Sequence, residues 1–458
     1  MNLFSSLSLS DSMLTNLESL EYREMTPIQA QSLPLILQGV DIIGKAKTGS
    51  GKTAAFAIGI LHQLQPELYH TQALVLCPTR ELADQVAKEI RRLARTIPNI
   101  KVLTLCGGVS IGPQLASLER GAHIVVGTPG RLLDHLRKNS LKLDRIKQLV
   151  LDEADRMLDM GFSEDIDQII SACPAEKQTL LFSATFPKDI ESISHRCQKN
   201  PQMISVETTE VNASIQQEFF ETKNNNDKLE GLLALLTHYQ PKSCIVFCNT
   251  KQTCNEVDEF LRMQHISSLA LNGDLEQKQR DQVLVRFANR SVSVMIATDV
   301  AARGLDIKQL DAVINYDLAK DSEVHVHRIG RTGRAGETGI ALNLIAPQDL
   351  SALNRLENFA DMQVELKSLP EIKTKQYPEP DMVTLNIDGG KKDKLRAGDI
   401  LGALTKDAGI AGDKIGKIDI FDFAAYVAVD KSVANQALKQ LQKKPLKGKQ
   451  FRARKFES

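Results

Sequence analysis

Residues 46–53 read AKTGSGKT and lie between the short apolar run 42–44 and the helical pattern 54–64. Glycines allow backbone N–H groups to approach a phosphate closely, and the N-terminus of the following helix favours anions. We therefore predict a phosphate-binding loop in which Lys52 reaches the β- and γ-phosphates and the Thr53 hydroxyl binds Mg²⁺. The strict motif begins with glycine where this chain has Ala46, so a glycine-rich turn that only caps a helix is the alternative. The expected nucleotide-binding residues of the loop are Thr48, Gly49, Ser50, Gly51, Lys52 and Thr53.

A phosphate-binding loop of this kind requires a second, acidic site. The stretch 150–155, VLDEAD, supplies it at the end of an apolar run. Asp152 is placed to hold Mg²⁺ through water, and Glu153 is placed to polarise the attacking water. The alternative is an acidic cap for the helix that follows, but the glycine loop in the same chain favours the catalytic interpretation.

The rest of the chain alternates short apolar runs with helical patterns. Apolar runs of four to six residues between helices indicate buried parallel strands and hence an α/β fold with right-handed crossovers. Ligands of such sheets bind at the carboxyl ends of the strands, where most of the unusual residue clusters fall. The predicted strands are 73–77, 101–106, 123–126, 148–151, 178–182, 244–248, 293–297 and 312–315.

Two breaks in this pattern divide the chain into domains. The periodicity lapses around 201–213, and the stretch 373–380, KTKQYPEP, has the composition of a linker. The last segment has the order β–α–β–β–α–β, which is that of a split βαβ sandwich. Its expected elements are a strand at 383–387, a helix at 398–407, two strands within 415–429, a helix at 432–441 and a strand at 450–455. We predict α/β domains at 1–207 and 213–368, a linker at 369–380 and an α+β domain at 381–458.

With both GSGKT and DEAD in place, the chain closely resembles a DEAD-box RNA helicase over residues 4–345. The resemblance implies two tandem RecA-like parallel-sheet domains, ATP with Mg²⁺ as cofactors, and single-stranded RNA bound across both domains. It also identifies an adenine-binding element, FSS…EYREMTPIQ, made of Phe4, Tyr22, Thr26, Pro27 and Gln29. The amide of Gln29 can donate and accept at the adenine edge, with aromatic packing from Tyr22. A structural loop glutamine is the alternative.

The resemblance further assigns RNA contacts and arginine fingers. Hydroxyls, backbone amides and arginines suit a sugar–phosphate backbone and carry no sequence readout. In the first domain the RNA contacts are Arg80, Gly108, Thr128 and Arg131; in the second they are Thr250, Gly273, Arg280 and Thr298. Asp306 would hold the ATP ribose, and the SAT motif at 183–185 would link hydrolysis to strand separation, its hydroxyls bonding Asp155 or capping a turn. Arg331 and Arg334 of HRIGRTGR would act on the γ-phosphate, and with Arg328 we expect them on one helix face.

The C-terminal segment is basic in a chain that is neutral overall. The whole chain has 57 Lys and Arg against 57 Asp and Glu, whereas residues 381–458 hold 16 basic and 10 acidic residues, a net of +6. Such a tail suggests a polyanion partner. The segment order resembles an RNA-recognition-motif fold, but Thr384 occupies one stacking position and only Tyr426 provides an expected aromatic. We therefore expect contacts through basic loops and the last strand: Lys391, Lys392, Lys394, Lys443, Lys444, Lys447, Lys449, Arg452 and Arg454.

The motifs IDGGKK (387–392), GDILGAL (398–404) and IGKI (415–418) resemble the DbpA subfamily of bacterial DEAD-box proteins. This resemblance implies a monomeric RNA-dependent ATPase that its tail recruits to a hairpin of 23S ribosomal RNA during 50S subunit assembly. A DNA-translocating helicase and a non-enzymatic RNA-binding scaffold are the rival functions. The DEAD, SAT and TPGR motifs argue against the first, and the complete phosphate and finger motifs argue against the second.

Cysteine content and hydropathy indicate the cellular compartment of the protein. The 7 cysteines include no CxxC pair, and Cys244 and Cys248 fall on one face of a predicted strand. We expect buried structural thiols in a reducing cytosol. No segment approaches the length of a membrane span, and the expected location is cytoplasmic.

Overall fold

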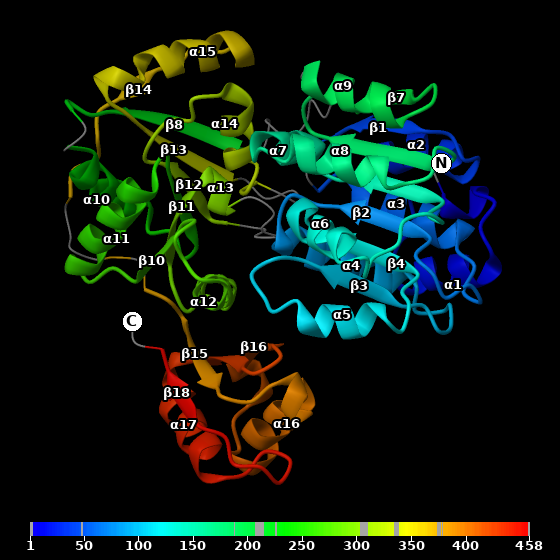
Figure 1. Cartoon of the computed structure of the whole chain (residues 1–458). Helices are drawn as coiled ribbons and strands as arrows, with labels where there is room; N and C mark the ends of the chain where they lie inside the picture. Colours follow the sequence, from blue (N-terminus) through cyan, green and yellow to red (C-terminus); the bar gives the residue numbers. More distant parts are fainter. Residues whose placement is uncertain are drawn as a thin grey trace. The chain divides into compact units, whose positions relative to one another are not determined.

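The computed structural model describes residues 3–46, 49–186, 188–206, 215–224, 227–302, 310–333, 339–372, 377 and 379–456. They form two compact units, one holding the described residues up to 206 and the other those from 215 onward. Each unit contains a large sheet flanked by helices (Figure 1). No helix in the described ranges is both long and apolar enough to span a bilayer.

The first unit is built on a parallel sheet in the order β3-β4-β2-β5-β6-β1-β7. Strands β2, β4, β5 and β6 are buried at every position, as expected for a sheet covered on both faces. The strands are β1 (Ile42–Lys45), β2 (Ala73–Leu76), β3 (Val102–Leu105), β4 (Ile124–Gly127), β5 (Gln148–Leu151), β6 (Gln178–Ser183) and β7 (Gln202–Ser205).

Helices cover both faces of this sheet. One apolar core joins it to α1–α4, and a second joins it to α6–α9. The helices are α1 (Asp11–Ser19), α2 (Pro27–Leu37), α3 (Lys52–Gln63), α4 (Arg80–Leu93), α5 (Gly112–Leu118), α6 (Pro129–Arg137), α7 (Ala154–Asp159), α8 (Ser163–Ser171) and α9 (Lys188–Cys197).

The second unit holds a parallel sheet in the order β10-β11-β9-β12-β13-β8-β14. Its main core includes α10 and α11, while α15 packs on a separate cluster with β8 and β13. The strands are β8 (Ile215–Glu221), β9 (Cys244–Cys248), β10 (Ser268–Leu271), β11 (Val294–Thr298), β12 (Ala312–Asn315), β13 (Gly339–Ile345) and β14 (Leu366–Lys367). The helices are α10 (Asp227–Tyr239), α11 (Lys251–Met263), α12 (Gln277–Ala288), α13 (Asp299–Ala302), α14 (Ser322–Ile329) and α15 (Leu350–Ala360).

The C-terminal part of the second unit is a small antiparallel sheet in the order β16-β17-β15-β18. Its two helices share one apolar core with the sheet. The elements are β15 (Met382–Ile387), α16 (Ala397–Gly402), β16 (Ile415–Ile420), β17 (Ala425–Asp430), α17 (Ala434–Lys443) and β18 (Ala453–Lys455). A single π-helical turn, 403–407, follows α16.

The predicted fold class, two RecA-like parallel sheets and a small α+β sheet, is confirmed. Cys244 and Cys248 are both fully buried, as the predicted strand requires. The expected strand at 450–455 is shorter, because only Ala453–Lys455 pairs with β15. Strands β7, β8, β10, β13 and β14 were not predicted from the sequence. Strand β7 has one buried residue in four, and β8 has polar residues at 216–218, so neither contains a continuous apolar run of four residues.

Candidate functional site

The phosphate loop, the DEAD motif and the SAT motif follow three adjacent strands. They begin after β1, β5 and β6, and β6 pairs with both β5 and β1. Because all three strands are parallel, their carboxyl ends meet at one edge of the sheet. The sheet therefore brings together the described residues of the glycine loop, 46 and 49–53, with 152–155 and 183–185, which are far apart in the sequence.

Backbone conformation fixes the shape of the glycine loop. Gly49 and Gly51 have φ of +85° and +98°, in the left-handed region that favours glycine. A Cβ on Gly51 would lie 2.6 Å from Nε2 of Gln29, so this position also has no room for a side chain. Lys52 begins α3 and is buried, with Nζ donating to the Ala46 carbonyl over 2.7 Å. Its ammonium is thereby held across the loop.

The predicted adenine element packs against the same loop. Gln29 is buried, accepts a hydrogen bond from the Thr26 N–H and donates to the Gly51 carbonyl over 3.1 Å. The hydroxyls of Thr26 and Ser50 are buried without a hydrogen-bond partner. Tyr22 donates to Glu89 of α4 over 2.7 Å and meets the ring of Phe4 edge-on. Gln29 therefore stabilises the glycine loop through its hydrogen bond to Gly51.

The acidic motif combines a buried carboxylate with a strained backbone. Asp152 is almost fully buried, and this burial raises its pKa to about 7, although the nearby Lys52 ammonium opposes the shift. Glu153, the residue before α7, has φ +52° and ψ +52°, a left-handed conformation that is uncommon for a residue other than glycine. Strain of this kind is concentrated at functional sites.

Asp155 links the DEAD motif to the SAT motif. Its Oδ2 accepts hydrogen bonds of 3.0 Å from both the N–H and the hydroxyl of Thr185. The Asp155 N–H lies 3.4 Å from the Ser183 hydroxyl oxygen. The expected bonding of the SAT hydroxyls to Asp155 is therefore present.

The predicted RNA contacts of the first unit follow β2, β3 and β4, the other half of the sheet. Arg131 donates from Nη1 to Gln114 and from Nη2 to the Val109 carbonyl, each over 3.0 Å, which ties α6 to the loop after β3. Gly108 in that loop has φ +74°. Arg80 begins α4 with its Nη1 buried and without a hydrogen-bond partner. Thr128 precedes α6, and its hydroxyl makes no cap hydrogen bond.

The predicted RNA contacts of the second unit occupy the corresponding strand ends. Thr250 follows β9 and caps α11 by accepting from the Thr253 N–H. Thr298 ends β11, and its hydroxyl lies 3.4 Å from the Ala301 N–H. Arg280 of α12 donates to the Ala301 carbonyl over 2.6 Å. Gly273 follows β10, and the space where its Cβ would stand is open.

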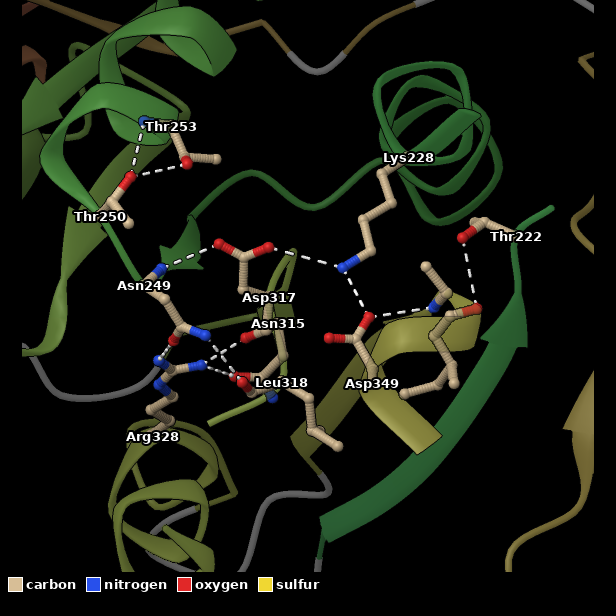
Figure 2. A network of polar contacts seen from close by, with 12 residues as sticks. Thr222, Lys228, Asn249, Thr250, Thr253, Asn315, Asp317, Leu318, Arg328 and Asp349 are labelled. Atoms are coloured by element: carbon tan, nitrogen blue, oxygen red, sulfur yellow. Dashed lines mark hydrogen bonds and ion pairs between the residues drawn. The ribbon is translucent and has the colours of Figure 1, made fainter. Parts of the chain in front are cut away.

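Arg328 joins these loops, and the sequence analysis gave it no role of its own. Its guanidinium is buried and donates to both carboxylate oxygens of Asp299, each over 2.7 Å. It also donates to the side chains of Asn249 (2.9 Å) and Asn315 (3.1 Å) and to the Asp317 carbonyl (2.6 Å). Figure 2 shows how this network continues from Asn249 through Asp317 to Lys228. Its acceptors come from three different loops, so spacing along the sequence could not reveal it.

The expected single helical face of arginines is wrong. Helix α14 ends at Ile329, so Arg328 points into the network from its last turn while Arg331 lies in the turn beyond. An arginine buried among acceptors has no need of an external polyanion. Arg334, Asp306 and Thr48 lie outside the described residues.

The basic residues of the C-terminal sheet gather in its loops. Lys447, Lys449, Arg452 and Arg454 are all exposed. Lys447 donates to the Lys394 carbonyl over 3.2 Å, while Lys449 lies 3.6 Å from Asp393 and Arg454 lies 3.6 Å from Asp388. The segment 446–454 thus lies against the loop 388–394.

The sheet face that carries Thr384 and Tyr426 is covered within the second unit. The Thr384 hydroxyl bonds the side chains of Asn289 (3.2 Å) and Ser291 (2.7 Å), which follow α12. Tyr426 is 2% exposed and its hydroxyl bonds Gln282 of α12. The Tyr426 ring is also covered by Phe456, which stacks on it at 5.9 Å between centroids, and Arg286 of α12 lies 5.0 Å from the centroid of the Phe456 ring.

Comparison with known proteins agrees with this geometry. Family models match at 26–193 (DEAD/DEAH box helicase), 227–336 (helicase conserved C-terminal domain) and 384–455 (DbpA RNA binding domain). The chain is 54% identical to the ATP-dependent RNA helicase DbpA of Escherichia coli K12 over 455 residues, 99% of both chains. It is 41% identical to the DEAD-box helicase CshA of Geobacillus kaustophilus over 372 residues, 81% of this chain and 79% of that one. The solved structure of S. cerevisiae Dbp5 bound to RNA and ADP BeF3 has a TM-score of 0.73 at 31% identity, covering 81% of this chain and 96% of that one.

The chain therefore belongs to the DEAD-box family of ATP-dependent RNA helicases. It is an RNA-binding enzyme that uses ATP, as the motifs implied. Within the family, the C-terminal model and the full-length similarity assign it to the DbpA subfamily.

Proposed function

We propose that this helicase hydrolyses ATP with Lys52, Asp152, Glu153, Arg331 and Arg334 and separates short RNA duplexes locally, on 23S ribosomal RNA during 50S subunit assembly. The main support is the meeting of the glycine loop, Asp152 and Asp155 at adjacent strand ends of one sheet. Gln29, Tyr22, the loop 48–53 and Asp306 bind the nucleotide, while Glu153 polarises the attacking water. The two arginines stabilise charge that develops on the γ-phosphate.

The residues present fit Mg²⁺. The hydroxyl of Thr53 and the carboxylate of Asp152 are hard oxygen ligands, and a buried carboxylate is a group that a divalent cation stabilises in its charged form. Thr53 and Asp152 would hold the ion, the latter through water. When bound, the ion neutralises charge on the β- and γ-phosphates.

RNA is held by groups that contact its backbone rather than its bases. The contacts are Arg80, Gly108, Thr128 and Arg131 in the first unit and Thr250, Gly273, Arg280 and Thr298 in the second. Because such contacts carry no sequence information, the core alone would not choose a target.

Targeting belongs to the residues from 381 onward, beyond the linker 369–380 and the two functional domains at 1–207 and 213–368. Its sheet face is covered within the second unit, so the exposed cations of the last loop and of β18 carry the contact: Lys447, Lys449, Arg452 and Arg454. A net charge of +6 in this segment favours a polyanion, and we assign it a hairpin of 23S ribosomal RNA. The protein would act as a monomer in the cytoplasm.

Exchange of Glu153 tests the catalytic assignment. Glu153→Gln should retain ATP and RNA binding but slow hydrolysis by roughly 10²–10⁴, the usual contribution of a general base. The measurement is ATP turnover with saturating RNA, together with binding of a fluorescent ATP analogue. Turnover near the parent rate would contradict the role of Glu153, and equal stimulation by single-stranded DNA would favour the DNA-helicase rival.

Charge removal tests the targeting assignment without truncating the chain. Changing Lys447, Lys449, Arg452 and Arg454 together to Gln should raise the amount of ribosomal RNA needed for half-maximal ATPase and reduce its salt dependence. The matched control changes four exposed cations of the second unit that lie outside its C-terminal sheet: Lys223, Arg262, Lys320 and Arg355. Equal effects of both variants, or no preference of the parent for ribosomal over unrelated RNA, would refute targeting by the tail.

A further inference from the structure

We propose that Phe423, flanked by Lys391 and Lys392, is a stacking platform for one unpaired base of the bound RNA. This inference rests on the proposed RNA recognition by the C-terminal domain and adds to it an aromatic contact outside the sheet face. Phe423 lies in the turn between β16 and β17, which the sequence analysis did not single out.

The exposure of Phe423 has no structural explanation in the fold. Its side chain is 74% exposed, compared with 66% for Met263 and 63% for Tyr69. Phe421, two residues earlier, packs edge-on against Tyr426 at 5.4 Å between ring centroids. The same turn thus directs one ring inward and leaves the other in water, where it contributes no burial to stability.

The turn is rigidly placed beside a lysine loop. The Phe421 N–H donates to the Ala424 carbonyl over 2.8 Å, which closes the turn. The N–H groups of Lys391 and Lys392 donate to the carbonyls of Phe421 (2.8 Å) and Asp422 (3.0 Å). A Cβ at Gly390 would stand 2.2 Å from the Phe421 carbonyl oxygen, so glycine is required for this approach. The backbone of the two lysines is therefore fixed against the turn that carries the exposed ring.

The charges around the ring favour an anion. Lys391 and Lys392 are exposed, and in the described part of the chain neither has an ion-pair partner. The carboxylates of the lysine loop are engaged elsewhere, Asp388 with Arg454 and Asp393 with Lys449. Asp422 is the remaining exposed acid of the turn. The lysine loop and the turn that carries the ring thus hold two lysines and one carboxylate that have no ion-pair partner in the described part of the chain.

An exposed aromatic beside lysines matches the chemistry of an unpaired nucleotide. The base stacks on the ring while the phosphates lie near the cations, and stacking does not depend on base identity. A paired base inside a duplex has no free face to offer, so this platform selects loops, bulges and single-stranded overhangs. The usual alternative, stacking on the sheet face, is blocked because Tyr426 lies against α12.

The absence of tryptophan from the chain provides a direct test. Phe423→Trp in the full-length protein introduces a single tryptophan at the proposed contact, whose emission can be excited selectively over that of the 6 tyrosines. The probes are an RNA hairpin with an unpaired loop and a blunt-ended duplex that has the same stem. We expect the hairpin to quench the emission and the duplex to leave it nearly unchanged. The matched control is Phe359→Trp, at an exposed phenylalanine of α15, where the hairpin should cause no quenching.

Affinity measurements complete the test. Phe423→Ala should weaken binding of the hairpin roughly 5- to 100-fold, the range of a single base–aromatic stack, while Phe423→Tyr should preserve it. Phe359→Ala should bind as the parent does. Parent-like hairpin binding by Phe423→Ala, or equal quenching by hairpin and duplex, would overturn the stacking platform and leave the loop-cation proposal standing. Failure of the parent to prefer the hairpin would overturn both.

Discussion

Arg328→Lys is a conservative substitution by charge that should destabilise the second unit. An arginine side chain has five N–H donors in a fixed planar fork. All five are used in this protein: one from Nε to Asp299, two from Nη1 to Asn315 and the Asp317 carbonyl, and two from Nη2 to Asn249 and Asp299. The side chain is 1% exposed, so water cannot replace them.

The magnitude follows from counting donors. A lysine ammonium offers three donors at one point, so at least two of the five acceptors lose their partner. A buried acceptor left unsatisfied costs about 1–3 kcal/mol, which gives roughly 2–6 kcal/mol for the pair. Relaxation of the loops recovers part of this cost, so we expect the loss of unfolding free energy to fall in the lower part of this range.

Urea denaturation of the full-length protein measures the effect through the transition of the second unit. The matched control is Arg355→Lys at an exposed arginine of α15, which should stay within about 0.5 kcal/mol of the parent. RNA-stimulated ATPase should also fall, because Asn249 and Asp299 adjoin the proposed RNA contacts Thr250 and Thr298. Denaturation of Arg328→Lys that matches the control would refute the donor count.

Two further predictions concern the same unit. Lys228→Met should lower the free energy of unfolding by about 3–5 kcal/mol, because it leaves the carboxylates of Asp349 (2.7 Å) and Asp317 (3.4 Å) without their cation. The control Lys199→Met breaks an exposed ion pair and should not shift the denaturation midpoint. A similar shift in both variants would contradict the reasoning. Burial, assisted by the Arg328 charge, lowers the pKa of His325 from 6.5 to about 3, so the unfolded chain binds the proton more readily than the folded protein does. The free energy of unfolding should therefore fall as the pH drops below 6.5, by up to about 1.4 kcal/mol per pH unit. His325→Gln should flatten this part of a pH series of denaturation curves, and an unchanged slope would exclude His325 as its source.

The large features of the fold were accessible from the sequence because burial on both faces leaves continuous apolar runs. The runs at 73–77, 148–151 and 244–248 are strands, and motifs that follow parallel strands necessarily share an edge. Edge strands could not be predicted in this way. Strand β7 has only one buried residue in four, so its sequence, QMIS, has the composition of a loop.

The polar networks could not be predicted from the sequence for a different reason. The partners of Arg328 lie 11 to 79 residues away in the sequence, and the burial of Arg328 depends on where α14 ends. The same holds for the cover over Tyr426, since nothing in the pattern of β17 indicates that α12 fills the face where a base would stack. Such contacts are set by tertiary packing and leave no periodic signal.

The two large sheets have the same topology. The nucleotide site of the first unit can therefore be compared with the equivalent position in the second unit. The orders β3-β4-β2-β5-β6-β1-β7 and β10-β11-β9-β12-β13-β8-β14 correspond strand by strand. In the first unit, Lys52 begins the helix after β1 and its ammonium acts on Asp152 after β5. In the second, Lys228 lies in the first turn of the helix after β8 and binds Asp317 after β12.

The lysine and the aspartate thus recur at equivalent positions, but their surroundings differ. Lys52 rises from a glycine loop beside two buried hydroxyls that lack partners, whereas Lys228 is neutralised by Asp317 and by the additional carboxylate of Asp349. A cation already paired with two carboxylates has no charge left for a phosphate, and the stretch before α10, 222–227, contains no glycine. The second unit has therefore turned the position of a phosphate site into an internal brace. Through Asp317 and Asn249 that brace supports the loop that begins at Thr250. The lysine–aspartate pair that we propose for catalysis in the first unit thus holds, in the second unit, the loop of a proposed RNA contact.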